Sequence, residues 1–500
     1  MLQVGSRPAV KLLSWLVMLA QAPVARAQQV AIKDPTLQQQ LDKWFSQAAR
    51  RAPGEWGVAV ADARGQLVWS VNATRPMIPA STVKLFTTGY ARTVLGGDAR
   101  QSTRVLGTGS LDSSGTWIGT WAIEVNGDPT LERPLRTGPM LHDLAAQLAD
   151  RGIRRLTGPL AVQSAVGEAD ATWPAVWNSR HKGSRFAPLI GDLMLNENQV
   201  SFTLAPGQKG RSPVVALAVP EGIGELVEIK ARTVKGRRNQ LQIRQLPTGR
   251  FVVTGQMGTS ARHRTWSGPS NNPHAVLEAT WSSALRRAGV EWVRAPGMGT
   301  ASGTSGKLTL AEVTSAPFDS IASEVNTRSL NIGAEAMLRW ASGADPLGAA
   351  KLTEHVQQIT GDYLGVHLVD GSGLSSDDRA TPYAFVTYLA RFPSTPNGRN
   401  FSMLLPANGS GTLRKLASGL PAPGVVRAKT GTLGNAATLV GYLGHKDGLI
   451  LISVMYNGSR VYAAKQQQWQ LFRLLGADGT MVPGDAITAE IGGEDREPPQ

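Results

Sequence analysis

The chain has no cysteine among its 500 residues. Disulfides, thiolate zinc sites and cysteine catalysis are therefore excluded. The fold must be held together by a buried apolar core, which a chain of this length can supply over two or three domains. Long apolar runs are also absent: beyond residue 27 no segment has eighteen uninterrupted apolar residues, so none is expected to span a bilayer.

The N-terminus has the pattern of a secretory signal peptide. Arg7 and Lys11 precede the apolar run 12–24, and Ala25-Arg26-Ala27 has the small-x-small spacing of a cleavage site. We therefore expect residues 1–27 to be removed on export and the mature chain to reside in the periplasm.

Acidic residues are scarce relative to basic ones. The chain has 37 Asp and Glu against 51 Lys and Arg, which gives a formal net charge of +14. A protein of this charge is attracted to polyanions. Because the chain is expected to be exported, we expect no nucleic-acid partner, but a loose association with an anionic wall polymer or membrane surface. The oligomeric state is left open.

The two ends of the chain have the patterns of one domain. Helical spacing over 36–49 and 465–475, and strand-like patterns over 56–71 and 424–458, predict an α+β domain in which helices flank an antiparallel sheet. Between these ends, short β-like runs alternate with Gly- and Pro-rich turns. The predicted parts are a signal peptide (1–27), the first part of the terminal domain (28–95), an inserted, mostly β region of one or two domains (96–305), the second part of the terminal domain (306–476) and a disordered tail (477–500).

A serine and a lysine open one of the helical patterns. In Ser81-Thr82-Val83-Lys84 the two side chains are three positions apart, so they share a helix face. Serine needs a base to become a nucleophile, and lysine can be that base where burial or nearby cations lower its pKa. Ser179 and Lys182 match the same S-x-x-K motif, but their stretch is polar and we interpret that match as chance.

Two further motifs follow in order. Ser329-Leu330-Asn331 lies where another helical pattern starts, and it could equally be a helix cap. Lys429-Thr430-Gly431-Thr432 lies on a predicted strand, where lysine and a hydroxyl can bind a carboxylate and glycine admits a substrate backbone. A turn at a strand end is the alternative. The order S-x-x-K, S-x-N, K-T-G is the signature of active-site serine enzymes that act on penicillin and its peptide analogue.

The chain also contains NGDPTL (126–131), VDGSGLS (369–375) and GTLRKL (411–416). On these segments and the three motifs it resembles the D-alanyl-D-alanine carboxypeptidase/endopeptidase family, the class C low-molecular-mass penicillin-binding proteins. Ser81 and Ser329 are 248 positions apart, a far longer interval than in ordinary serine β-lactamases. The resemblance implies a penicillin-recognising, transpeptidase-like domain with inserted domains, and it implies no metal or organic cofactor.

The same resemblance implies a mechanism. Ser81 would be acylated by the penultimate D-alanine of a peptidoglycan stem peptide, and β-lactams would inhibit covalently. Lys84 would take the serine proton. Ser329, held with Lys84 and Asn331, would pass a proton to the leaving amine. Water would then release the acyl group, and D-configured cross-links could be cut in the same way.

The K-T-G strand would bind the substrate. By motif matching, Lys429 and Thr430 would hold the terminal carboxylate, Gly431 lies between them and the oxyanion site, and the N–H groups of Thr432 and Ser81 would bind the oxyanion.

Two positions depart from the family pattern. Ser376 stands where the family usually has an arginine, and Gln163 stands where it tends to have an aspartate. Both positions are associated with recognising the diamino acid of the stem peptide, so that preference is left open. A catalytically weak peptidoglycan-binding or scaffolding protein of the same fold is the main alternative function, and an exported β-lactamase is a third.

Overall fold

The computed structural model describes residues 35–483 except 134–137, 167–168, 295–306 and 417. The predicted signal peptide and most of the predicted tail lie outside the described residues. Residues 477–483, at the start of that tail, lie against the strand region, where Val482 N–H donates to the Gly424 carbonyl at 2.9 Å. Among the described residues, none of the helices combines the length and the apolar character that crossing a bilayer requires.

One antiparallel sheet combines the two ends of the chain. Its strand order is β16-β17-β18-β1-β2. β1 pairs with the central β18 along its whole length, from Glu55 opposite Asn457 to Asp62 opposite Ile450. The strands are β1 (Glu55–Asp62), β2 (Leu67–Val71), β16 (Val426–Leu433), β17 (Ala436–His445) and β18 (Gly448–Asn457). This arrangement confirms the α+β class expected from the sequence.

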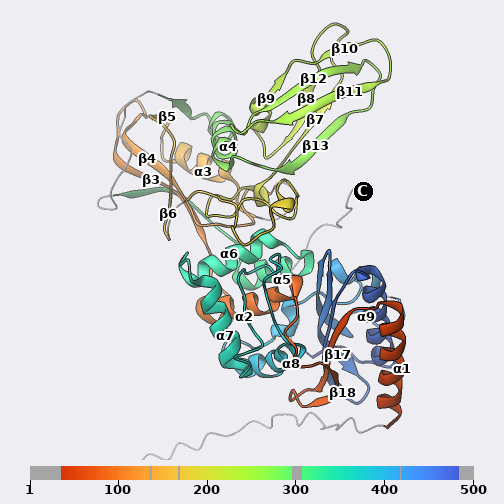
Figure 1. Ribbon diagram of the computed structural model, residues 1–500. Helices are drawn as coiled ribbons and strands as arrows, with labels where there is room; N and C mark the ends of the chain where they lie inside the picture. Colours follow the sequence, from red (N-terminus) through yellow and green to blue (C-terminus); the bar gives the residue numbers. More distant parts are fainter. Residues whose placement is uncertain (1–34, 134–137, 167–168, 295–306, 417, 484–500) are drawn as a thin grey trace, which may run out of the picture.

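Helices cover both faces of this sheet (Figure 1). Because side chains alternate along a strand, Val58 and Val60 of β1 face α1 (Pro35–Arg51) and α9 (Val461–Gly476). Ala59 and Ala61 belong to the core on the other face, with the helices α2 (Val83–Leu95), α7 (Gly348–Thr360) and α8 (Pro382–Arg391). Burial on both faces explains why these strands read as continuous apolar runs.

The inserted region is built mainly from strands. One sheet has the order β15-β3-β4-β6, β14 pairs with β5, and two further sheets have the orders β13-β7-β8 and β10-β12-β11, with β9 beside β12. The strands of the first two sheets are β3 (Ser102–Leu111), β4 (Trp117–Val125), β5 (Arg155–Thr157), β6 (Ala161–Ser164), β14 (Glu291–Val293) and β15 (Leu308–Thr314). Those of the two further sheets are β7 (Gln199–Ala205), β8 (Val214–Val219), β9 (Val227–Ile229), β10 (Arg232–Val234), β11 (Asn239–Gln245), β12 (Phe251–Gly258) and β13 (Arg264–Pro269).

Two helices accompany these strands, α3 (Leu141–Asp150) and α4 (Pro273–Arg287). The helical spacing of residues 140–153 predicts the first of them, and the second was not predicted from the sequence. The predicted boundary after residue 305 assigns β15 to the terminal domain, but β15 pairs with β3 of the inserted region. The division of the chain into domains stays a prediction.

The insert is fastened to two helices of the terminal domain, α5 (Phe318–Arg328) and α6 (Asn331–Ser342). Arg339 of α6 binds the buried carboxylate of Asp192 through two hydrogen bonds of 3.1 Å. The indole N–H of Trp340 donates to the carbonyl of Asn126 at 2.6 Å. Both helices also pack against α2, so the insert lies against the elements that carry two of the three motifs.

Candidate active site

Ser81 lies in a short 3₁₀ turn, η1 (Ala80–Thr82), that runs directly into α2. The preceding Ala80 has a left-handed φ of +49°, a conformation that costs free energy for a residue with a Cβ. Neighbouring strands hold this turn in place. Thr438 of β17 donates its hydroxyl to the Pro79 carbonyl at 2.7 Å, and Asn457 accepts a hydrogen bond from Ile78 N–H at 2.9 Å.

Lys84 is fully buried beneath Ser81. Its Nζ donates to Ser81 Oγ at 3.0 Å, to Asn331 Oδ1 at 2.7 Å and to the Ser372 carbonyl at 2.6 Å. Burial lowers the pKa of Lys84 to about 8, against the opposing charges of Asp370 and Glu335. Of the three partners, only the Ser81 hydroxyl has a proton to give to the neutral amine.

Asp370 organises the loop that brings the Ser372 carbonyl to Lys84. Its carboxylate accepts backbone hydrogen bonds from Ser372 at 3.0 Å, Gly373 at 2.5 Å and Ser375 at 2.8 Å. A Cβ on Gly373, whose φ is +74°, would lie 1.9 Å from the Ala80 carbonyl oxygen. This position therefore requires glycine, because the loop must closely approach the turn that carries the serine.

Two groups near Asp370 were not singled out from the sequence. Trp177 of the insert donates its indole N–H to Asp370 Oδ2 at 3.0 Å. Glu335, one helical turn after Asn331, accepts a hydrogen bond from Gly371 N–H at 3.1 Å. Burial, together with the charge of Asp370, raises the pKa of Glu335 to about 8. A helical pattern places Glu335 near Asn331, but no signal in the sequence connects Trp177 to the motifs.

Ser329 is not a helix N-cap, which was one interpretation of its motif. It ends α5 with φ +59° and ψ 43°, and Leu330 is the residue that caps α6. The left-handed residue makes the chain change direction between the two helices. Ser329 Oγ accepts a hydrogen bond from Lys429 Nζ at 2.9 Å, whereas Asn331 contacts Lys84 and donates to the Phe186 carbonyl at 2.7 Å.

Lys429 is a second fully buried lysine. It lies on β16 and, besides Ser329, it donates to the Thr430 carbonyl at 2.8 Å. Burial and the neighbouring charge of Lys84 hold its pKa well below the usual range. Each motif lysine is thus paired with a serine hydroxyl, and the two lysines are close enough to influence each other electrostatically.

The remaining K-T-G residues follow Lys429 along β16. Thr430 is half-buried and Thr432 is exposed at the end of the strand. A Cβ on Gly431 would lie 2.1 Å from Thr438 Oγ1 and 3.0 Å from Ser81 N. Glycine is required here because β16 approaches the start of α2, and not only for the substrate backbone considered in the sequence analysis.

Ser376 and Gln163, the two positions that depart from the family pattern, lie away from the motif residues. Ser376 is exposed on the loop after Ser375, and its carbonyl accepts a hydrogen bond from Arg379 at 2.7 Å. Gln163 lies on β6 opposite Glu124, and its Oε1 accepts a hydrogen bond from Lys307 at 2.7 Å. No contact within the described part of the chain joins either side chain to the motif residues.

The second S-x-x-K match has no such geometry. Ser179 and Lys182 are exposed, and the Lys182 ammonium lies over the Trp173 ring, 5.6 Å from its centroid. In the described residues, no cluster of three or more His, Asp or Glu side chains could hold a metal ion.

An α+β fold with a serine hydroxyl hydrogen-bonded to a buried lysine defines a class of active-site serine hydrolases, and comparison with known proteins places this chain within it. Residues 37–476 match the D-Ala-D-Ala carboxypeptidase 3 (S13) family, and the chain belongs to that family. The protein is a serine-type D-Ala-D-Ala carboxypeptidase, as the resemblance implied.

Individual relatives agree. The chain is 28% identical over 429 residues to the D-alanyl-D-alanine carboxypeptidase of Actinomadura sp. (strain R39). The aligned part covers 80% of this chain and 77% of that protein. It is 22% identical over 404 residues to D-alanyl-D-alanine carboxypeptidase DacB of Haemophilus influenzae, covering 77% of this chain and 81% of the relative.

The fold is shared with a solved structure. The crystal structure of penicillin binding protein 4 (dacB) from Haemophilus influenzae matches with a TM-score of 0.67 and 22% identity, covering 85% of this chain and 99% of the other. The fold predicted from the sequence is thereby confirmed.

Proposed function

We propose that Ser81 is the nucleophile of this carboxypeptidase and Lys84 its base. The observation that carries the proposal is the full burial of Lys84, whose Nζ lies 3.0 Å from Ser81 Oγ. In the neutral state Lys84 donates to Asn331 and the Ser372 carbonyl, and its lone pair faces the Ser81 hydroxyl.

The reaction then proceeds in two steps. Ser81 Oγ attacks the carbonyl carbon of the penultimate D-alanine while its proton passes to Lys84. The C–N bond breaks, the terminal D-alanine leaves with a proton on its amine, and an ester to Ser81 remains. Water hydrolyses this ester and restores the serine hydroxyl.

The second serine–lysine pair serves the leaving group and the terminal carboxylate. Ser329 Oγ relays the proton to the departing amine, and Lys429 with Thr430 binds the carboxylate. A carboxylate beside Lys429 favours its charged form and offsets the burial that lowers its pKa. The N–H groups of Ser81 and Thr432 bind the oxyanion.

The same site extends to related bonds. We propose that β-lactams acylate Ser81; the Haemophilus influenzae relative has been solved in complex with a β-lactam, which supports this. Cross-links that end in a D-configured centre are cut by the same steps, with Ser376 and Gln163 in place of the family's charged residues where the diamino acid binds. The N-terminal pattern supports export to the periplasm.

Labelling with a fluorescent penicillin tests the nucleophile. We expect wild type to retain the label after denaturation, Ser81→Ala to lose it, and Ser179→Ala, the matched change in the second S-x-x-K, to retain it. Label retained by Ser81→Ala would contradict the proposal.

Two parallel measurements separate the alternatives. Release of D-alanine from a stem pentapeptide supports the enzyme, and its absence together with no labelling supports a peptidoglycan-binding scaffold. Consumption of free penicillin without trapped label would indicate a β-lactamase. Incubation with a cross-linked muropeptide measures endopeptidase activity, and cell fractionation with and without residues 1–27 measures export.

A further inference from the structure

The far end of the insert consists of three loops, residues 206–212, 235–238 and 259–263, which we call the basic tip. Figure 1 shows this end, beyond β10, β11 and β12, at the opposite extremity of the insert from α5 and α6. Backbone hydrogen bonds join the loops into one surface: Thr233 N–H donates to the Arg211 carbonyl at 2.7 Å, and Ser260 N–H donates to the Gly236 carbonyl at 2.9 Å.

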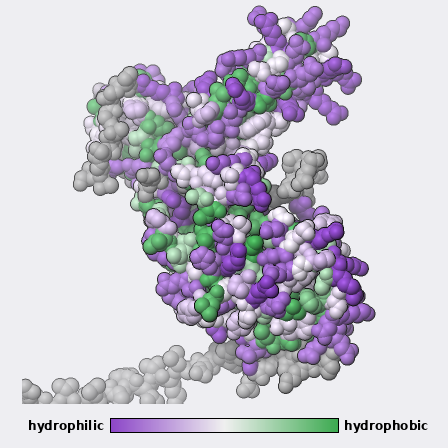
Figure 2. Space-filling view, viewed as in Figure 1, coloured by the Kyte–Doolittle hydropathy of each residue, from purple (hydrophilic) through white to green (hydrophobic). Residues whose placement is uncertain are grey.

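Positive charge dominates the sequence around the basic tip. From residue 229 to residue 277 the sequence contains no Asp or Glu. The tip and the strand ends beside it are hydrophilic on the face seen in Figure 2. Their basic residues are Lys209, Arg211, Lys235, Arg237, Arg238, Arg262 and Arg264.

These side chains also have no partners. Elsewhere on the insert, arginines form ion pairs, as Arg286 does with Glu225 and Arg287 with Glu221. Among the described residues, no ion pair or side-chain hydrogen bond involves the basic side chains of the tip. Like charges held together without counter-charges repel one another, so an anion binding here would relieve that repulsion.

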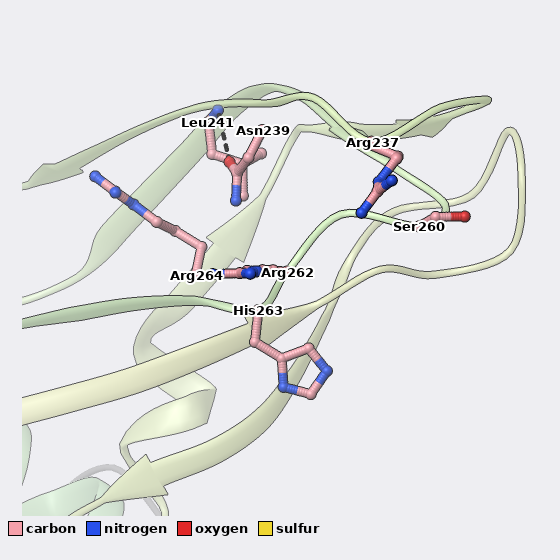
Figure 3. Close-up of a pocket in the computed structure, with 7 residues that line it drawn as sticks. All are labelled: Arg237, Asn239, Leu241, Ser260, Arg262, His263 and Arg264. Atoms are coloured by element: carbon pink, nitrogen blue, oxygen red, sulfur yellow. Dashed lines mark hydrogen bonds between the residues drawn. The ribbon is translucent and has the colours of Figure 1, made fainter.

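The tip contains a hollow of about 420 Å³ beside the start of β13. Figure 3 shows its lining, which includes three arginines (Arg237, Arg262 and Arg264), together with Asn239 and Ser260. Asn239 Oδ1 already accepts a hydrogen bond from Leu241 N–H at 3.3 Å, which leaves its NH₂ group available. No carboxylate lines the hollow. Guanidinium groups present paired donors that match the oxygens of a phosphate.

We propose that the basic tip binds the phosphate head groups of an anionic phospholipid membrane, with one phosphate seated in the hollow. A membrane fits better than a linear polymer because the unpaired charge is concentrated at an extremity. On the side of α4 the arginines Arg286 and Arg287 are held in ion pairs, whereas the loops at the extremity can meet a flat surface together. Val214 and Leu217 are 52% and 60% exposed on the adjacent β8 and add apolar contact near the interface.

This binding would hold the enzyme at a membrane surface by the end of the insert that lies away from the catalytic elements. The active site would remain accessible to peptidoglycan. The inference does not rest on the proposed roles of Ser81 and Lys84, and the two are tested separately.

Vesicle co-sedimentation tests the proposal, using the protein as purified from an exporting host. We expect binding to vesicles of phosphatidylglycerol and phosphatidylcholine, little binding to pure phosphatidylcholine, and loss of binding as salt rises. Each basic residue near an anionic surface contributes roughly fivefold in affinity, so the combined variant Arg237→Ser, Arg262→Ser, Arg264→Ser should bind about 100-fold more weakly.

The matched control removes the same charge from exposed sites off the tip: Arg51→Ser, Arg154→Ser and Arg399→Ser, for which little change is expected. Penicillin labelling of every variant shows that the catalytic domain is folded. Equal vesicle binding by the tip variant and wild type would overturn the proposal. Binding only to long-chain polyphosphate, or only to inorganic phosphate, would also overturn it in favour of a polymer or a small-anion site.

Discussion

At the scale of single residues, the proposed mechanism makes reactivity depend on the charge of Lys84. In that mechanism the amine must be neutral to accept the Ser81 proton, and burial lowers its pKa to about 8. The negative charge of Asp370, and that of Glu335 where this residue is ionised, act in the opposite direction. Acylation by a β-lactam should therefore rise with pH through the pKa of Lys84 and level off above it.

Glu335→Gln tests this balance, because it removes the charge that Glu335 carries above its pKa of about 8, while an amide oxygen can still accept from Gly371 N–H. A negative charge stabilises the ammonium form, so its removal lowers the pKa of Lys84. The rising limb of acylation should move to lower pH by about 0.5 unit, mostly in its upper part, where Glu335 is ionised in wild type. Stopped-flow labelling between pH 6 and 10 measures the shift. Glu354→Gln, on the exposed side of α7, should not move it, and a limb displaced to higher pH would contradict the assignment.

The sequence predicted which residues meet at the site, but it did not predict which groups affect the pKa of Lys84. Ser81 and Lys84 meet because their spacing alone places them on one helix face. Glu335 and Asp370 affect the pKa of Lys84 only because folding buries them beside it. The sequence DGSG (370–373) is typical of a turn, and Asp370 does hold one, but the turn also presents the Ser372 carbonyl to Lys84.

At the scale of elements, the side chain of Trp177 connects the insert to the DGSG loop. The indole N–H of Trp177 donates to Asp370 Oδ2, and the ring meets Trp173 edge-on, with centroids 5.6 Å apart. A hydrogen bond to a charged group contributes roughly 1.5 to 3 kcal/mol. This contact links a loop of the insert to the residue that holds Ser372 on Lys84.

Trp177→Phe should therefore loosen the DGSG loop. We expect faster hydrogen exchange over residues 371–375 and a several-fold lower kcat, with less change in KM, because the proton acceptor is affected more than the substrate site. Trp173→Phe is the matched control, because it makes the same change in a side chain that forms no hydrogen bond to Asp370. If the two variants behave alike, the indole hydrogen bond has no positioning role.

The packing of α2, α7 and α8 encloses a neutral histidine. His355 Nε2 lies 2.9 Å from the Tyr388 hydroxyl, and its ring meets those of Tyr90 and Phe392. Burial lowers the pKa of His355 from 6.5 to about 4. As the pH falls below 6.5 the unfolded chain binds a proton that the folded protein does not, so stability is lost progressively between pH 6.5 and 4.

The expected loss is about 3 kcal/mol at pH 4 relative to neutral pH. In His355→Phe this part of the pH dependence should vanish, although the variant is less stable at pH 7 because the Tyr388 hydroxyl loses its partner. Melting temperatures of both proteins between pH 4 and 7 measure the difference. Parallel curves for wild type and variant would show that His355 is not the group responsible.

At the scale of the whole molecule, local patterns predicted the sheet made from both chain ends but not how the insert attaches. The strands around 56–71 and 424–458 were recognisable because each alternates or runs apolar by itself. The return of β15 to β3 and the contacts of Trp177 depend on residues far apart in sequence. No periodicity within one segment reports such contacts.

A buried ion network joins the insert to the helix that ends at Ser329. Glu197 of the insert accepts hydrogen bonds from Arg133 at 3.2 Å and from Arg328 Nη2 at 2.9 Å. Arg328 is the last residue of α5, so its position and that of Ser329 are coupled through the backbone. Glu324 of the same helix accepts from both arginines and completes the network.

Glu197→Gln should weaken the attachment of the insert to α5 without preventing acylation of Ser81. Removing the charge leaves the buried Arg133 and the partly buried Arg328 with Glu324 as their counter-charge. Breaking a buried ion pair costs roughly 3 to 5 kcal/mol, and we expect a smaller loss of stability here because Glu324 remains. We expect faster hydrogen exchange over residues 325–333 and slower D-alanine release, because Ser329 shifts relative to Lys429, while penicillin still labels Ser81 to completion. Glu221→Gln, which breaks the exposed pair with Arg287, should change neither. If exchange at 325–333 stayed as in wild type, the network would not position the α5–α6 junction, and the insert would have to influence the site through its other contacts, those of Trp177 with Asp370 and of Phe186 with Asn331.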